Sequence, residues 1–248
     1  MPPRHRPSAS HPLELHLPFH GTWTVQNSPA NRVPSHGTDL FGTRYAIDFI
    51  AVDRQDRTAA SRSWRSALTT EPPELFFGYG LGVLAPRAGT VRVAHDGEAD
   101  HAARRSQLSL LRYALGQPAR IRQGPAGIAG NHVILEEPQS GCFIAVVHLR
   151  QGSIRVRSGE TVSAGQLIGE CGNSGNSTQP HIHLQAMDGL QLHRTQGVPI
   201  VFRDFLERLP AEVETTVRCG LPFNDSVVSP VRTDRFPADE TVAPDWPR

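Results

Sequence analysis

Lysine is missing from the 248-residue sequence, so all 25 basic residues are arginine. A chain without lysine cannot form a Schiff base, use an amine nucleophile or carry a lipoyl or biotinyl group. The chain also has almost no net charge, because 24 acidic residues nearly balance the arginines. This balance argues against a dedicated binder of nucleic acid or of an anionic membrane surface.

Cysteine is scarce, and long apolar runs do not occur. The three cysteines are widely spaced, at Cys142, Cys171 and Cys219, so neither a disulfide framework nor a CxxC zinc knuckle is indicated. No stretch has the apolar length of a signal peptide or a membrane span. We therefore expect a cytoplasmic protein, or a cell-wall or extracellular one if the true start lies upstream or export is non-classical.

Glycine and proline are abundant, with 22 and 21 residues. They argue against a helical bundle, because helix interiors reject proline and are weakened by glycine. Short apolar or alternating runs between turn residues instead predict strands. These runs lie at 13–17, 22–26, 44–52, 89–94, 132–137, 142–149, 161–162, 167–168, 182–185 and 198–205.

We expect three parts: a disordered lead at 1–12, one domain at 13–209, and a Pro-rich tail at 210–248 that is either extended over the surface or disordered. The domain carries insertions at about 54–80 and 96–123. Within the second insertion, leucines at helical spacing predict a short amphipathic helix over 101–116.

Histidine is the feature that carries chemistry, and the chain has twelve of them. In PHIHLQ, His181 and His183 are two residues apart, so on a strand both imidazoles lie on one face. An apolar strand, FIAVVHL, ends in His148, and Asp48 interrupts the apolar run RYAIDFIA. A buried carboxylate is costly unless it is paired with an arginine or binds a cation, and we favour the cation.

These segments resemble the M23 family of zinc metallopeptidases, the lysostaphin- and LytM-like enzymes that cut peptide cross-links of bacterial cell walls. The resemblance covers roughly residues 33–187. It rests on LAPRAGTVRVAHDG, on GNHVILEE and above all on AVVHLRQGSIRVRSGETVSAGQLIGECGNSGNSTQPHIHLQ. It implies a compact, mostly antiparallel β-sandwich with a narrow groove over the metal.

The resemblance also implies residue roles. His183 matches a zinc ligand and Asp48 the carboxylate ligand, while His148 and His181 match the two catalytic histidines. The family has a further ligand histidine four residues before the aspartate, where this chain has Arg44, which cannot bind a cation.

We assign the missing ligand to His36, twelve residues before Asp48, because a longer loop can return its ring to the site. A rival assignment replaces Asp48 by Asp39, in the spacing His36-x-x-Asp39. We prefer Asp48, because AIDF matches the family's strand whereas Asp39 lies in a turn-like segment.

The implied cofactor is one Zn²⁺ per chain. Two imidazoles and one carboxylate leave a fourth tetrahedral position for water, as a catalytic zinc site requires. The sequence has neither HExxH nor HxxEH, so a histidine must be the general base. Which of His148 and His181 takes this role, and which stabilises the oxyanion, stays open.

The wall of the implied groove falls in CGNSGNS. There Gly172, Asn173 and Gly175 let a thin peptide approach, and Asn176, Ser177 and Thr178 offer hydrogen bonds to it. Of the other eight histidines, His132 is the best further ligand candidate, because it begins a strand near the site.

Three other functions compete. A lipoyl or biotinyl carrier shares the turn pattern of SGETVSAGQLIGE but needs a lysine. A sugar phosphocarrier pairs two histidines but does not require His36 and Asp48. A non-hydrolytic binding or activating module with the M23 fold remains open, as does the choice between glycyl-glycine and D-alanyl cross-links in a peptidoglycan substrate.

Overall fold

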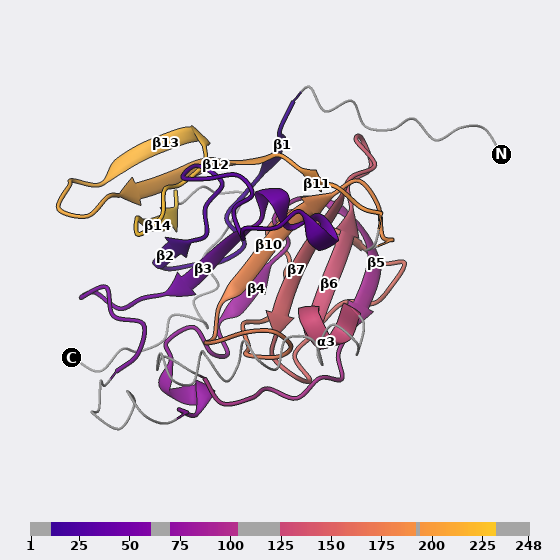
Figure 1. Ribbon diagram of the computed structural model, residues 1–248, viewed down its shortest axis with the longest axis horizontal. Coiled ribbons are helices and arrows are strands. Elements are labelled where there is room, and N and C mark those ends of the chain that lie inside the picture. Colours follow the sequence, from indigo (N-terminus) through magenta and orange to yellow (C-terminus); the bar gives the residue numbers. More distant parts are fainter. Residues whose placement is uncertain (1–10, 61–69, 104–124, 192–193, 232–248) are drawn as a thin grey trace.

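A large, mostly antiparallel sheet dominates the computed structural model, which describes residues 11–60, 70–103, 125–191 and 194–231 (Figure 1). The sequence's prediction of a mostly β protein is confirmed. Along the large sheet the strand order is β1-β12-β14-β2-β3-β10-β7-β6-β5-β8, with β11 beside β10 and β13 beside β12, and β4 and β9 form a separate sheet. The strand bounds are β1 (Leu13–Leu15), β2 (Trp23–Gln26), β3 (Ile47–Ala51), β4 (Gly82–Leu84), β5 (Gly89–His95), β6 (Asn131–Glu136), β7 (Phe143–Leu149), β8 (Thr161–Val162), β9 (Leu167–Glu170), β10 (Ile182–Met187), β11 (Gly197–Val198), β12 (Ile200–Arg208), β13 (Thr215–Gly220) and β14 (Val227–Pro230).

Helices are few and short in the described part of the chain. They are the 3-10 helices η1 (Leu40–Tyr45) and η3 (Pro73–Leu75) and the α-helix α3 (Pro125–Ala129). None of them has the length and apolar character that crossing a membrane would require. The helix predicted at 101–116 falls almost wholly outside the described residues.

The main hydrophobic core unites the large sheet with the β4–β9 sheet, whose strand β4 lies partly behind β10 in Figure 1. Side chains alternate along a strand, so Ile182, Leu184 and Ala186 of β10 enter this core. Their neighbours His183 and Gln185 therefore project from the opposite face of the sheet. The alternation places polar side chains on a rigid strand with an apolar back.

Strand β3 is anchored in the same core. The Phe49 ring meets the rings of Phe19 and Phe202 at centroid distances of 5.0 and 5.5 Å, and Ile47 is fully buried. Truncating a buried phenylalanine of this kind costs about 3–5 kcal/mol. Asp48, between Ile47 and Phe49, is therefore held on a stiff part of the backbone.

The chain beyond Leu209 differs from the extended tail that the sequence predicts. Strands β13 and β14 both pair with β12, and β14 also pairs with β2. The sequence does not reveal these two strands, because β13 has no buried residue and β14 is only four residues long. The sheet thus continues to Pro230.

Candidate metal centre

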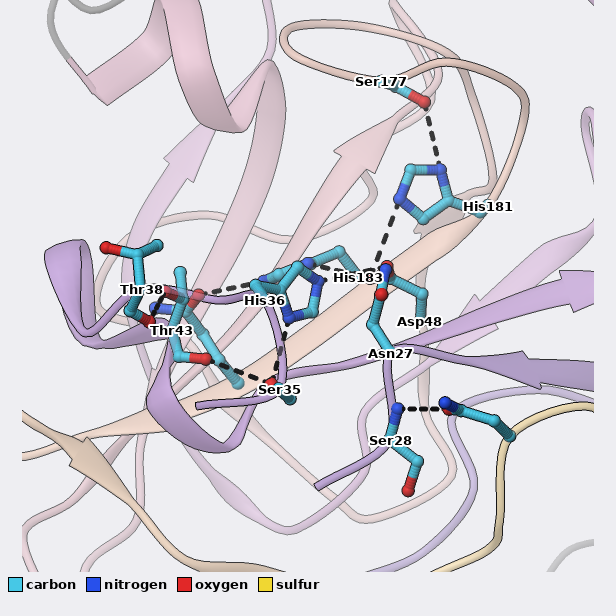
Figure 2. Close-up of polar contacts among 12 residues, drawn as sticks. Asn27, Ser28, Ser35, His36, Thr38, Thr43, Asp48, Ser177, His181 and His183 are labelled. Carbon is cyan, nitrogen blue, oxygen red and sulfur yellow. Dashed lines mark hydrogen bonds and ion pairs between the residues drawn. The ribbon is translucent and has the colours of Figure 1, made fainter. Parts of the chain in front are cut away.

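Asp48 and His183 lie opposite each other on β3 and β10, which are antiparallel neighbours. Oδ1 of Asp48 is 2.9 Å from Nδ1 of His183, and both side chains are buried (Figure 2). The register of two core strands therefore fixes this pair.

His36 reaches the same carboxylate from the loop before η1. Its Nε2 is 3.1 Å from Oδ2 of Asp48 (Figure 2). The loop is held in place because the amide of Ser35 donates to the carbonyl of Arg44. One ligand atom each from His36, Asp48 and His183 lies within 4.8 Å of the others, a group of three that could hold a metal ion.

The rival carboxylate lies elsewhere. Asp39 is exposed and forms an ion pair of 2.7 Å with Arg44. Arg44, which occupies the position where the family has a histidine, is thus part of a surface ion pair. Of the described residues, only His36, Asp48 and His183 form a group with metal-ligand spacing.

The outer nitrogen of His183 is fixed by Gln185. The amide nitrogen of Gln185 donates to the carbonyl of Phe41, so its Oε1, 2.9 Å from His183 Nε2, accepts the proton of that nitrogen. His183 as a neutral ring then has a bare Nδ1 facing Asp48. Gln185 also ties this histidine to η1, next to the loop that carries His36.

The same reasoning applies to His36. The hydroxyl of Ser35 can donate to the carbonyl of Thr43 at 3.3 Å and accept from His36 Nδ1 at 3.0 Å, which leaves Nε2 of His36 bare. Two bare nitrogens thus face one carboxylate, and this arrangement is favourable only with protons or a cation between them. Zn²⁺ prefers such nitrogen and carboxylate donors, so the residues fit the ion.

The charge state of Asp48 agrees with a cation site. Burial alone would raise the pKa of its carboxyl, but hydrogen bonds from His183 and His36, formed when protons occupy the facing nitrogens, hold that pKa well below the ordinary value. Asn27 also donates to Oδ2, at 2.7 Å. Conversely, burial would lower the pKa of His183, but Asp48 raises it. The site therefore keeps a buried negative charge that attracts either a proton or a metal ion.

His148 and His181 lie beside this group. The ring of His148 is 4.8 Å from that of His181 and 6.0 Å from that of His183, measured between centroids. Nε2 of His181 is 3.8 Å from Oδ1 of Asp48. The structure thus brings all five sequence-predicted residues, His36 included, into one place.

Backbone carbonyls orient both of these rings. Nδ1 of His148 donates to the carbonyl of Ser174 at 2.9 Å, and Nδ1 of His181 donates to that of Gln179 at 2.8 Å. In each neutral ring Nε2 is consequently bare and can accept a proton. Burial lowers the pKa of both histidines, that of His148 well below its ordinary value.

The loop of residues 172–175, here called the wall loop, packs tightly. A Cβ on Gly172 would lie 2.4 Å from the backbone nitrogen of Arg150, and Gly175 has a φ of +68°. Ser177 is buried and contacts the His181 ring at 3.0 Å instead of facing outward. Its predicted contact with a substrate is thereby replaced by support of His181.

His132 lies outside the group of three ligands. Its Nδ1 donates to the carbonyl of Gly130, and its ring stacks on His95 at a centroid distance of 5.4 Å. The sequence reasoning missed Asn27, Gln185 and Ser174, which contact the site residues. Only Gln185 had a usable signal, since it follows His183 by two residues and so shares its face of β10.

The described part of the chain is a β protein with a His–Asp–His group suited to a metal ion and two further histidines beside it. Asp48 and His183 of this group are buried, and His36 is half-buried. Residues 113–196 match the model of peptidase family M23. This match includes His148, His181 and His183, confirms the resemblance to M23 peptidases, and supports peptidase activity.

Several solved structures are similar to this chain. The catalytic domain of the antimicrobial peptidase lysostaphin from Staphylococcus simulans is 20% identical with a TM-score of 0.35, covering 62% of this chain and 74% of that one. The prophage-encoded M23 protein EnpA from Enterococcus faecalis, as the catalytic domain of a point mutant, is 19% identical with a TM-score of 0.35, covering 62% and 73%. A putative glycyl-glycine endopeptidase LytM from Ruminococcus gnavus is 16% identical with a TM-score of 0.32, covering 62% and 42%. At such identities and TM-scores the similarity says nothing about the substrate of this chain.

Proposed function

We propose that this protein is a zinc-dependent metalloendopeptidase that hydrolyses peptide cross-links of peptidoglycan. The observation that carries the proposal is the meeting of His36, Asp48 and His183 around a point beside two histidines with bare Nε2 atoms. When bound there, zinc would polarise the scissile carbonyl and lower the pKa of a water molecule toward about 7.

The proton of the attacking water needs an acceptor within the site. His148 and His181 are suited to accept it, because each holds its own proton on Nδ1 toward a backbone carbonyl. Their lowered pKa values keep both rings neutral near neutral pH. The ring that takes the proton becomes a cation whose Nε2 can donate to the oxyanion or to the leaving amine.

The choice of a peptidoglycan substrate rests on the family resemblance of the site segments, from Ala145 to Gln185. The tight wall loop suits a substrate with little side-chain bulk, such as a glycyl or alanyl peptide. We propose further that the protein acts at the cell wall. Mapping its N-terminus in cell fractions tests this location.

The test of the function combines metal analysis with hydrolysis. We expect the purified protein to bind one zinc ion per chain and to release peptides from purified peptidoglycan. His148→Ala and His181→Ala should each abolish hydrolysis while zinc stays bound. The matched control His95→Ala removes a partly exposed histidine from β5, which β6 separates from β7, and should keep both properties.

The outcomes separate the competing functions. Zinc binding without hydrolysis, together with binding of the wild-type protein to peptidoglycan, would favour the binding or activating module. A protein that neither binds zinc nor hydrolyses peptidoglycan would overturn the proposal. Hydrolysis that persists in His148→Ala would overturn the role of His148.

A further inference from the structure

A short segment of the second insertion, residues 96–101 with the sequence DGEADH, lies against two loops of the site. We call this segment the strap. It follows β5 directly, and no function is expected of it from sequence. Its two aspartates and its histidine bind the turn at residues 150–154, which follows His148 on β7, and the wall loop.

The two aspartates of the strap bind different parts of these loops. The carboxylate of Asp96 accepts from the amides of Gly152 at 2.7 Å and Ile154 at 3.1 Å. Asp96 therefore links two amides of the same turn. The contacts made by this residue do not reach the wall loop.

Asp100 instead joins the turn to the wall loop. Its Oδ2 accepts from the amide of Gln151 at 3.0 Å, and its Oδ1 accepts from the amide of Asn173 at 2.6 Å. The hydroxyl of Tyr79 also donates to Oδ2, at 3.2 Å. A single carboxylate thus bridges two loops that are about twenty positions apart in the sequence.

Further contacts fix the strap on the wall loop. Nε2 of His101 lies 2.9 Å from the carbonyl of Gly175, and the side-chain amide of Asn173 donates to the carbonyl of His101 at 2.6 Å. At the other end, the buried side chain of Asn131 accepts from the amides of Gly97 and Glu98, each at 2.8 Å. The strap is therefore bound along its whole length.

The wall loop contacts His148 at two points, and the turn that Asp100 joins to it begins two residues after His148. The carbonyl of His148 accepts from the amide of Gly172 at 3.0 Å, and its Nδ1 donates to the carbonyl of Ser174. His148 also has a φ of +65°, a backbone conformation that side-chain-bearing residues rarely adopt. Such a conformation persists only where the surroundings hold it.

We propose that Asp100 is a positioning residue for His148, acting by locking the wall loop to the turn that follows β7. The proposal rests on the proposed function, in which the His148 ring takes part in hydrolysis. A shift of the Ser174 carbonyl would turn the imidazole and move Nε2 away from the reacting atoms. Misplacement on the order of 1 Å reduces catalysis by roughly 100-fold.

The matched variants are Asp100→Asn and Asp96→Asn. Both replace a carboxylate that accepts two backbone amides, and in both the new NH₂ group faces one of those amides. Only Asp100→Asn weakens the link to the wall loop. Asp100→Glu restores the carboxylate on a longer side chain and serves as the conservative variant.

Three measurements test the proposal. The first is kcat and KM on a soluble cross-linked peptide, a muropeptide dimer or a pentaglycine peptide, whichever the wild-type protein cleaves. The second is zinc content. The third is an NMR comparison of two signals, the resonance of the Nδ1 proton of His148 and the amide hydrogen exchange of the wall loop. We expect Asp100→Asn to lower kcat about 10- to 100-fold with little change in KM or zinc content, and to weaken the Nδ1 resonance and wall-loop protection.

Asp96→Asn should leave kcat and the Nδ1 resonance as in the wild type, and Asp100→Glu should recover part of the loss. Equal kinetic losses in Asp96→Asn and Asp100→Asn, or loss of zinc in Asp100→Asn, would overturn the proposal. An inactive wild-type protein would overturn the proposed function instead. The NMR comparison still decides in that case: an unchanged Nδ1 resonance in Asp100→Asn overturns the positioning role, and its selective loss supports it.

Discussion

Asp48 faces His183 directly across the β3–β10 register, with Oδ1 of the carboxylate 2.9 Å from Nδ1 of the imidazole. Each residue has an apolar neighbour on either side that enters the core. The pair is therefore assembled by strand pairing before any ligand arrives. Only the third member of the group, His36, depends on a loop.

Replacing His36 by alanine tests the loop-borne ligand. His36→Ala should weaken zinc binding by more than the roughly 10- to 100-fold typical for loss of an outer partner of a ligand, because a donor atom itself is lost. Competition with a chelator measures the affinity. Asp39→Asn is the control, since Asp39 is exposed and paired with Arg44. A loss of zinc affinity in Asp39→Asn comparable to that in His36→Ala would revive the rival assignment, in which both residues bind the metal.

Removing the metal tests the coupling of the site to stability. A ligand that binds only the folded state raises its stability, so a chelator should lower the Tm of the zinc-loaded wild type. In Asp48→Asn, which lacks the charged ligand, the same chelator should leave Tm unchanged. A chelator effect of equal size in both proteins would show that zinc binds elsewhere.

Gln185 should affect metal affinity without touching the metal. Gln185→Leu removes the acceptor for Nε2–H of His183 and frees its ring, so zinc affinity should fall about 10- to 100-fold. Gln185→Glu keeps an acceptor at this position and should keep most of the affinity. Gln26→Leu, at an exposed position opposite Asp48 on β2, is the control. Equal affinities in Gln185→Leu and the wild type would contradict the orienting role.

His132 predicts a pH dependence of stability. Burial lowers the pKa of His132, although the carbonyl of Gly130 opposes this effect, and nearby His95 lowers it further. As the pH falls through about 6.5, the unfolded chain takes up a proton that the folded state refuses, so stability is lost on acidification. In His132→Asn this contribution disappears, and the free energy of unfolding should fall less between about pH 7.5 and 5.5. Urea unfolding of both zinc-loaded proteins measures the difference, and equal slopes would refute the prediction.

The parts of the site that follow local rules could be predicted from sequence. Two-residue alternation places His181 and His183 on one side of a strand, and an acid in an apolar run singles out Asp48. The end of the apolar run FIAVVHL singles out His148. Each of these signals lies within a few residues along the chain, and the sheet register then brings them together.

The supporting contacts could not be predicted, because they join residues far apart in sequence. Asp100 and Asn173 are separated by 73 positions, and Asn131 and Ser174 by 43. Such pairs leave no periodicity in the sequence. Strand β13 was missed for another reason: its residues are exposed or half-buried, so the alternation that reveals a strand is absent.

Gly175 of the wall loop should not tolerate a side chain without a large loss of stability. It has a φ of +68°, and a Cβ there would lie 2.3 Å from the backbone nitrogen of Gly130 and 2.7 Å from the carbonyl oxygen of Ile128. These atoms belong to backbone and cannot rotate away, so Gly175→Ala should cost more than the roughly 1–2 kcal/mol of the left-handed conformation alone. Gly152, with a φ of +73° and no atom within 4 Å of a Cβ, is the matched control, because Gly152→Ala has only the conformational cost. Urea unfolding measures the loss of stability in both variants. Similar losses would mean that the wall loop can move away from Gly130. The case for a fixed Ser174 carbonyl behind His148 would then be weaker.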